Sequence, residues 1–150
     1  MLLESVPRGV KPMKLAHAGS FESGRGGNQD QIIVGYGFPD MAHPWPQWPG
    51  VRHYVTVPPE QVWDDRRTTG GSGQICLGDS GGPTFLGPIG ASGRKRREVV
   101  ALTSASVGDC STGSIFARID NADVLAWIDN QMKQWLSISG AEAPRPDKRH

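Results

Sequence analysis

Gly78-Asp79-Ser80-Gly81-Gly82-Pro83 is the stretch of this chain that carries the most chemistry. The glycines around its serine allow a tight turn and a close backbone approach, because glycine lacks the Cβ that restricts other residues. A serine hydroxyl that is exposed on such a turn can attack a carbonyl group, provided that a base accepts its proton. The alternative interpretation is a simple glycine-rich turn, in a chain that holds 20 glycines.

With its flanks, this stretch resembles the active-site serine loop of the trypsin-like (chymotrypsin-fold) serine proteases. Ile32-Ile33-Val34-Gly35-Tyr36-Gly37 is similar to the family's strand that ends in Gly-aromatic-Gly, early in its second barrel. Ile115-Phe116-Ala117-Arg118-Ile119 is similar to its last strand, which a terminal helix follows. The resemblance covers roughly residues 1 to 136, with a diffuse alignment between residues 38 and 70.

The resemblance implies a role for each residue of the loop. Ser80 would be the nucleophile, and the backbone N–H groups of Gly78 and Ser80 would form the oxyanion hole. Asp79 would be a structural acid, buried in the family against the amino terminus that activation cleavage frees. A disulfide would join Cys76 to Cys110 and connect two walls of the substrate pocket; the alternative is two free buried thiols, as in cytosolic proteins.

The same resemblance implies a pocket for one substrate side chain. Its residues would be Gln74 at the base and Ser104, Ala105, Ser106 and Ser114 in the walls. Trypsin-type enzymes that prefer basic side chains hold an aspartate at the position of Gln74. The pocket is therefore expected to be neutral and polar, with no preference for arginine or lysine.

Two members of the family's catalytic triad have no counterpart in this chain. Neither the histidine motif nor the aspartate strand of the first barrel is found, and Met1-Leu2-Leu3-Glu4 resembles the tail of that aspartate strand. The chain therefore looks like the carboxy-terminal half of a protease, without its N-terminal barrel. The histidines present lie in unrelated contexts: His17, His43, His53 and His150. We expect none of them to act as the base.

Many Gly and Pro residues and short β-branched runs predict an all-β fold with prominent loops. By resemblance, the fold would be a six-stranded antiparallel barrel, the second barrel of the chymotrypsin fold, with a C-terminal helix. Strands are predicted near 31–36, 52–57, 83–87, 97–103 and 114–119, with a long loop over 58–73. The predicted organisation is an interbarrel connection (1–20), a barrel with its helix (21–136) and a disordered, polar, Pro-rich tail (137–150).

The helix is predicted over 121–136 from apolar residues that recur at helical spacing. Asp120 or Asn121 can cap its start. Ile128, Met132 and Trp135 are expected to pack the helix on the outside of the barrel.

Composition argues against several kinds of partner. The net charge is +1, and the basic cluster 94–97 lies between two predicted strands, where a solvated hairpin tip is expected. We therefore expect no nucleic-acid or membrane partner. No histidine–cysteine or histidine–carboxylate spacing indicates a metal site, and no cofactor is expected. The N-terminus lacks the apolar segment of a signal peptide, although the resemblance implies a secreted protein.

Three functions remain open at this point. The chain can be part of a serine endopeptidase that is inactive alone, because it carries only the nucleophile and the oxyanion hole. It can be a pseudoprotease, which binds peptides without cutting them. It can also be a truncated remnant that has no function of its own.

Overall fold

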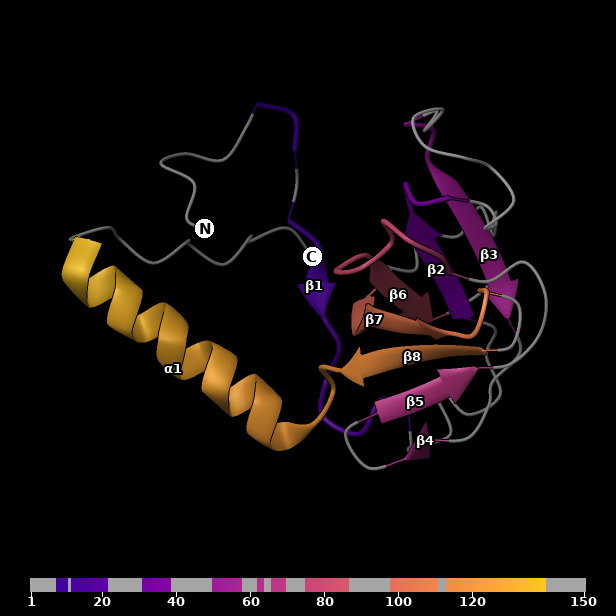
Figure 1. Cartoon of the computed structure of the whole chain (residues 1–150). Coiled ribbons are helices and arrows are strands. Elements are labelled where there is room, and N and C mark those ends of the chain that lie inside the picture. The colour runs from indigo at the N-terminus through magenta and orange to yellow at the C-terminus, as the bar shows by residue number, and fades with distance from the viewer. Residues whose placement is uncertain are drawn as a thin grey trace.

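The computed structural model describes residues 8–10, 12–21, 31–38, 50–57, 62–63, 66–69, 75–86, 98–110 and 113–139. Strands make up most of this part of the chain, and one helix follows the last strand (Figure 1). The predicted all-β organisation with a C-terminal helix is therefore confirmed.

The strands form one sheet. They are β1 (Lys14–Leu15), β2 (Gln31–Gly35), β3 (His53–Val57), β4 (Val62–Trp63), β5 (Arg66–Thr69), β6 (Pro83–Leu86), β7 (Glu98–Val107) and β8 (Gly113–Arg118). The hydrogen-bonded order is β3-β2-β6-β7-β8-β5-β4, with every neighbouring pair on this path antiparallel. Because β6 and β7 meet at the centre of this order, the end of the serine loop enters the middle of the sheet.

Strand β1 lies off this path and makes the sheet mixed. It pairs in parallel with the start of β7, where Leu15 faces Val99, while β8 pairs only from Ala101 onward. β8 therefore leaves the backbone groups at the start of β7 without partners on that side. Strand β1 supplies these partners. Among the described strands, β3 and β4 at the two ends are not paired with each other. The prediction of a closed, wholly antiparallel six-stranded barrel is therefore corrected.

Two short strands, β4 and β5, fall where the sequence predicted a long loop. β5 pairs with β8, with Thr68 opposite Ile115, and β4 pairs with β5. Their β-branched and aromatic residues favour strands, but each run is too short to be recognised by alternation. Pairing with β8 is a tertiary contact that local sequence does not reveal.

Strand β2 is covered on both faces. Ile32 and Ile33 point to opposite sides of the strand, and each is 2% exposed. Ile33 belongs to a core cluster that includes Val100 and Phe116, and Ile32 belongs to a second cluster with Phe85. This position explains why the strand is a continuous apolar run.

A buried ion pair near the end of β8 holds the segment that contains Phe21. The Arg118 guanidinium donates to both carboxylate oxygens of Asp120, over 2.8 and 3.1 Å, and the Asp120 side chain is fully buried. The same carboxylate accepts the backbone N–H of Phe21 at 2.9 Å, and Arg118 lies 5.5 Å from the centre of the Phe21 ring. Asp120 is therefore an anchor between two distant segments and does not cap the helix.

The helix α1 (Ala122–Ser139) begins beside this anchor. Asn121 caps it, because its side-chain oxygen accepts the N–H of Asp123 at 2.9 Å. The helix continues past the predicted end at residue 136, so 137–139 do not belong to the predicted disordered tail; residues 140–150 lie outside the described part.

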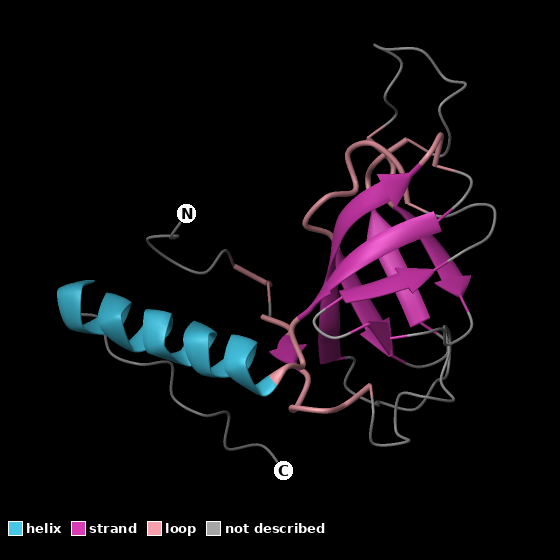
Figure 2. Cartoon of the chain, turned by 60° about the horizontal axis from the view of Figure 1, so that its bottom comes forward, coloured by secondary structure: helices cyan, strands magenta, loops and turns pink. Residues whose placement is uncertain are grey.

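Most of α1 extends away from the sheet (Figure 2). Val124, in its first turn, packs against the cluster of Ile32 and Phe85. Met132 and Trp135 are 46% and 47% exposed. The prediction that Ile128, Met132 and Trp135 pack the helix on the barrel is therefore wrong for Met132 and Trp135, because most of the helix extends away from the sheet; Ile128 is partly buried.

Candidate functional site

The serine loop connects a buried segment to β6 and presents Ser80 to solvent. The N–H of Asp79 donates to the Cys76 carbonyl at 3.1 Å, and the N–H of Gly82 donates to the Asp79 carbonyl at 2.9 Å. Gly78 has φ 94°, a conformation that only glycine adopts easily. The predicted tight turn is therefore present, and Ser80 is exposed on it.

Two amide groups on this turn remain available. The N–H groups of Asp79, Gly81 and Gly82 all donate to carbonyls. Within the part of the chain that the structure describes, the N–H groups of Gly78 and Ser80 have no hydrogen-bond acceptor. These are the amides predicted to form the oxyanion hole, and they lie on either side of Asp79, next to the serine hydroxyl.

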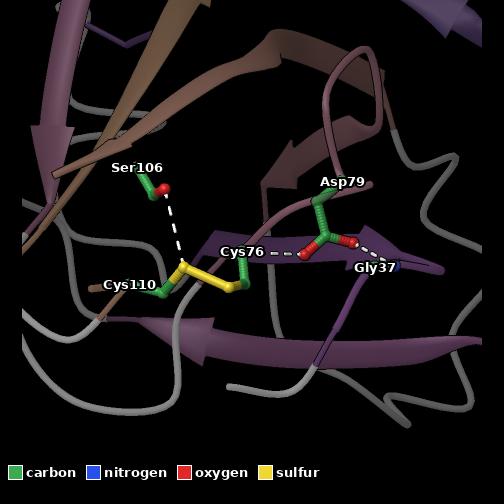
Figure 3. The surroundings of a disulfide bond; sticks show 5 residues. All are labelled: Gly37, Cys76, Asp79, Ser106 and Cys110. Carbon is green, nitrogen blue, oxygen red and sulfur yellow. Dashed lines mark hydrogen bonds between the residues drawn. A yellow bond between two sulfur atoms is a disulfide. The ribbon is translucent and has the colours of Figure 1, made fainter. Parts of the chain in front are cut away.

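Asp79 points away from solvent and fixes the turn. One carboxylate oxygen accepts the N–H of Gly37 at 2.7 Å, and the other accepts the N–H of Cys76 at 3.0 Å (Figure 3). A Cβ added at Gly37 would lie 2.6 Å from the Asp79 Cγ, and one at Gly35 would collide with the same carboxylate. The glycines at the end of β2 therefore make room for this side chain. In the sequence, these glycines were noticed only as part of a strand that ends in Gly-aromatic-Gly.

The disulfide is present and borders the loop. Cys76 and Cys110 are bonded, with their Cα atoms 5.2 Å apart. Both side chains pack with Phe38 in a small buried cluster. The predicted pairing is confirmed, and the alternative of two free thiols is wrong.

A cavity of about 280 Å³ lies beside Ser80. Its described lining consists of Ile75, Cys76, Leu77, Ser80, Thr103, Ser104, Ala105 and Ser106. The structure therefore brings together three of the five predicted pocket residues with the serine. Ser114 is fully buried in β8 opposite Ser106 and does not line this cavity. Gln74 lies outside the described residues.

A second, larger groove of about 780 Å³ also borders Ser80. Its described walls are Met13, Ile32, Val34, Gly35, Tyr36, Arg52, Tyr54, the loop residues 78–83 and Phe85. Met13, Tyr36 and Tyr54 in this groove are each about half exposed or more. The sequence did not predict this groove, because its walls come from segments that are far apart in the chain: Met13, residues in or next to β2 and β3, and the serine loop.

No described histidine lies in a cavity with Ser80, where it could act as a base. His17 and His53 line neither of the two cavities that contain Ser80. Within the described residues, the Ser80 hydroxyl has no hydrogen-bond partner. His43 and His150 lie outside the described part. Ser80 is thus exposed, and neither described histidine shares a cavity with it.

The described residues hold no group of three or more His, Cys, Asp or Glu side chains placed to bind a metal ion. Their one helix is not apolar enough to cross a membrane.

Neither a scan against protein-family models nor a search of curated proteins found a match to this chain.

Proposed function

We propose that this chain is the nucleophile-bearing half of a serine endopeptidase related to the trypsin-like family. One observation carries the proposal: an exposed serine hydroxyl on a rigid turn, flanked by the N–H groups of Gly78 and Ser80, which donate to no described acceptor. Donors arranged in this way suit the negative oxygen of a tetrahedral intermediate. The disulfide and the Ser104–Ser106 wall beside Ser80 agree with the sequence resemblance.

The proposed chemistry is acyl transfer. The Ser80 Oγ attacks a peptide carbonyl carbon while its proton passes to a base, and the carbonyl oxygen becomes an oxyanion that the amides of Gly78 and Ser80 bind. The C–N bond then breaks, the amine leaves with a proton from the base, and water hydrolyses the acyl-serine. Asp79 takes no part in proton transfer; it holds the turn through Gly37 and Cys76.

The base is proposed to come from a separate N-terminal barrel. The large groove beside Ser80 carries half-exposed apolar side chains, notably Met13, Tyr36 and Tyr54, which a partner domain would bury. We also propose an extracellular setting, because a disulfide persists in oxidising compartments.

The second candidate function is a pseudoprotease that holds a peptide without cleaving it. The observation in its favour is that neither described histidine shares a cavity with Ser80. Both candidates bind a polypeptide at the same place, and they differ in whether Ser80 ever reacts.

Labelling with a fluorophosphonate probe separates the two candidates. The purified chain alone should not be labelled at Ser80, nor should it cleave casein. Addition of a separately expressed first barrel from a trypsin-like protease should produce labelling that Ser80→Ala abolishes and that Ser137→Ala, at an exposed serine in α1, retains. Absence of labelling with the added barrel would favour the pseudoprotease. Labelling of the chain alone that His17→Ala or His53→Ala removes would show that it holds its own base.

A further inference from the structure

The N–H groups of Gly78 and Ser80 belong to two different peptide groups of the serine loop. In a trans peptide group the carbonyl and the N–H point in opposite directions, so a bound carbonyl fixes the direction of the N–H on the same group. The Ser80 N–H shares its peptide group with the Asp79 carbonyl, which accepts the N–H of Gly82 at 2.9 Å. The direction of the Ser80 N–H is therefore set within the loop itself.

The Gly78 N–H is held from outside the loop. It shares its peptide group with the Leu77 carbonyl, which accepts the backbone N–H of Phe38, just beyond β2, at 2.9 Å. Gly78 has φ 94°, and glycine adopts either sign of φ, so Gly78 itself does not prevent rotation of this group. After rotation, the carbonyl oxygen would point where the N–H now points, and it would repel an oxyanion there.

The donor of this hydrogen bond is itself firmly placed. The Phe38 side chain is 5% exposed and packs in one cluster with Cys76 and Cys110, the two halves of the disulfide. A Cβ added at Gly37 would lie 2.7 Å from the Leu77 carbonyl oxygen. The lack of a side chain at Gly37 therefore lets the carbonyl reach the Phe38 N–H.

We propose that Phe38 is a positioning residue for the oxyanion hole: its backbone N–H holds the Leu77 carbonyl and thereby directs the Gly78 N–H toward the oxyanion. The inference rests on the proposed function, which assigns the Gly78 amide to that oxyanion. Phe38 lines neither of the two cavities beside Ser80, so it acts through the peptide group that it binds. The segment after β2 thus controls one oxyanion donor, while the loop controls the other.

The test replaces the N–H of residue 38 by an ester oxygen, through incorporation of the α-hydroxy acid analogue of phenylalanine. This change keeps the Phe38 side chain and removes the donor. The matched control is an ester at Ile119, a residue 6% exposed whose N–H donates to the Val100 carbonyl at 3.0 Å. Each ester removes one buried backbone hydrogen bond, so the two should lower the midpoint of urea unfolding by similar amounts.

NMR of the isotopically labelled chain measures the direction of each N–H bond through residual dipolar couplings. In the natural chain, we expect the Gly78 N–H to have the direction seen in the structure. A scalar coupling across the hydrogen bond should join the Phe38 nitrogen to the Leu77 carbonyl carbon. The ester at residue 38 should change the direction of the Gly78 N–H but not that of the Ser80 N–H, and the ester at Ile119 should change neither.

A second measurement follows the reaction of Ser80 with the fluorophosphonate probe in the presence of the added first barrel. The ester at residue 38 should slow the labelling by about 100-fold, the effect of losing one oxyanion donor. The ester at Ile119 should leave the rate unchanged. If even the natural chain is not labelled, the proposed function fails, but the NMR measurements still decide whether Phe38 positions the Gly78 amide.

Two side-chain variants cover the case in which the ester at residue 38 does not fold. Phe38→Ala removes the contact with the disulfide, so it should weaken the coupling to Leu77 and shift the direction of the Gly78 N–H. Phe38→Leu keeps an apolar side chain and should preserve both.

Three results would overturn the inference. The first is a natural chain without the coupling between Phe38 and Leu77. The second is a Gly78 N–H that keeps its direction when that coupling is lost or weakened by the ester or by Phe38→Ala. The third is a change of direction at Gly78 that the ester at Ile119 produces equally.

Discussion

The carboxylate of Asp79 accepts the backbone N–H of Gly37 at 2.7 Å, across 42 residues of sequence. This contact joins the end of β2 to the turn that presents Ser80. The second carboxylate oxygen binds the N–H of Cys76, whose sulfur is bonded to Cys110. One side chain thus connects the strand, the turn and the disulfide, and it fixes the turn that carries Ser80.

Gly35→Ala should destabilise the chain by about 1–3 kcal/mol, because its Cβ would overlap the Asp79 carboxylate. The cost should be smaller in an Asp79→Ala background, where that carboxylate is gone. Gly37→Ala should keep much of its cost in the same background, since its Cβ would also lie 2.7 Å from the Leu77 carbonyl oxygen. Urea denaturation of the single and double variants measures these couplings. Equal costs of Gly35→Ala in both backgrounds would contradict the steric explanation.

Asp120→Ala should destabilise the fold by about 3–5 kcal/mol, because it leaves the Arg118 guanidinium buried without its partner. Asp129→Ala is the matched control: Asp129 pairs with Lys133 on the exposed surface of α1. Its loss should change the free energy of unfolding by only about 0.5 kcal/mol. Similar losses in the two variants, measured by urea denaturation, would show that the buried pair is not the anchor that the structure indicates.

Replacement of both Cys76 and Cys110 by alanine should lower the free energy of unfolding by about 4 kcal/mol, from the loss of a cross-link across 34 residues. The natural chain should show a comparable loss when dithiothreitol is added, whereas the double variant should not respond to the reductant. A chain whose unfolding is the same with and without dithiothreitol would argue against the bond.

Trp135→Ala should change the free energy of unfolding by less than about 0.5 kcal/mol, because the indole is 47% exposed on the part of α1 that leaves the sheet. Ile32→Ala, in the core beside the first turn of α1, should cost about 2–5 kcal/mol. Thermal or urea unfolding of the two variants gives the comparison. A loss above about 2 kcal/mol for Trp135→Ala would mean that the helix packs as its apolar spacing predicted.

The sequence predicted strands β2, β3, β6, β7 and β8 and helix α1. The spacing of apolar residues in α1 also predicted a packed face, and this was wrong for Met132 and Trp135. Periodicity shows that a helix has an apolar side but not that another element covers it. β1, β4 and β5 were missed for a related reason: they are short, and each exists through its pairing with a distant strand.

The sequence by itself determined the glycine-rich turn that carries Ser80, because the conformations open to glycine are a local property. It also supplied the two cysteines that form the disulfide. Tertiary structure alone decided the hydrogen-bond partners of Asp79 and Asp120. The Asp79 partner lies 42 residues away, and the Asp120 carboxylate binds an N–H 99 residues earlier in the chain. Burial and long-range hydrogen bonds arise when segments meet, so no local pattern records them.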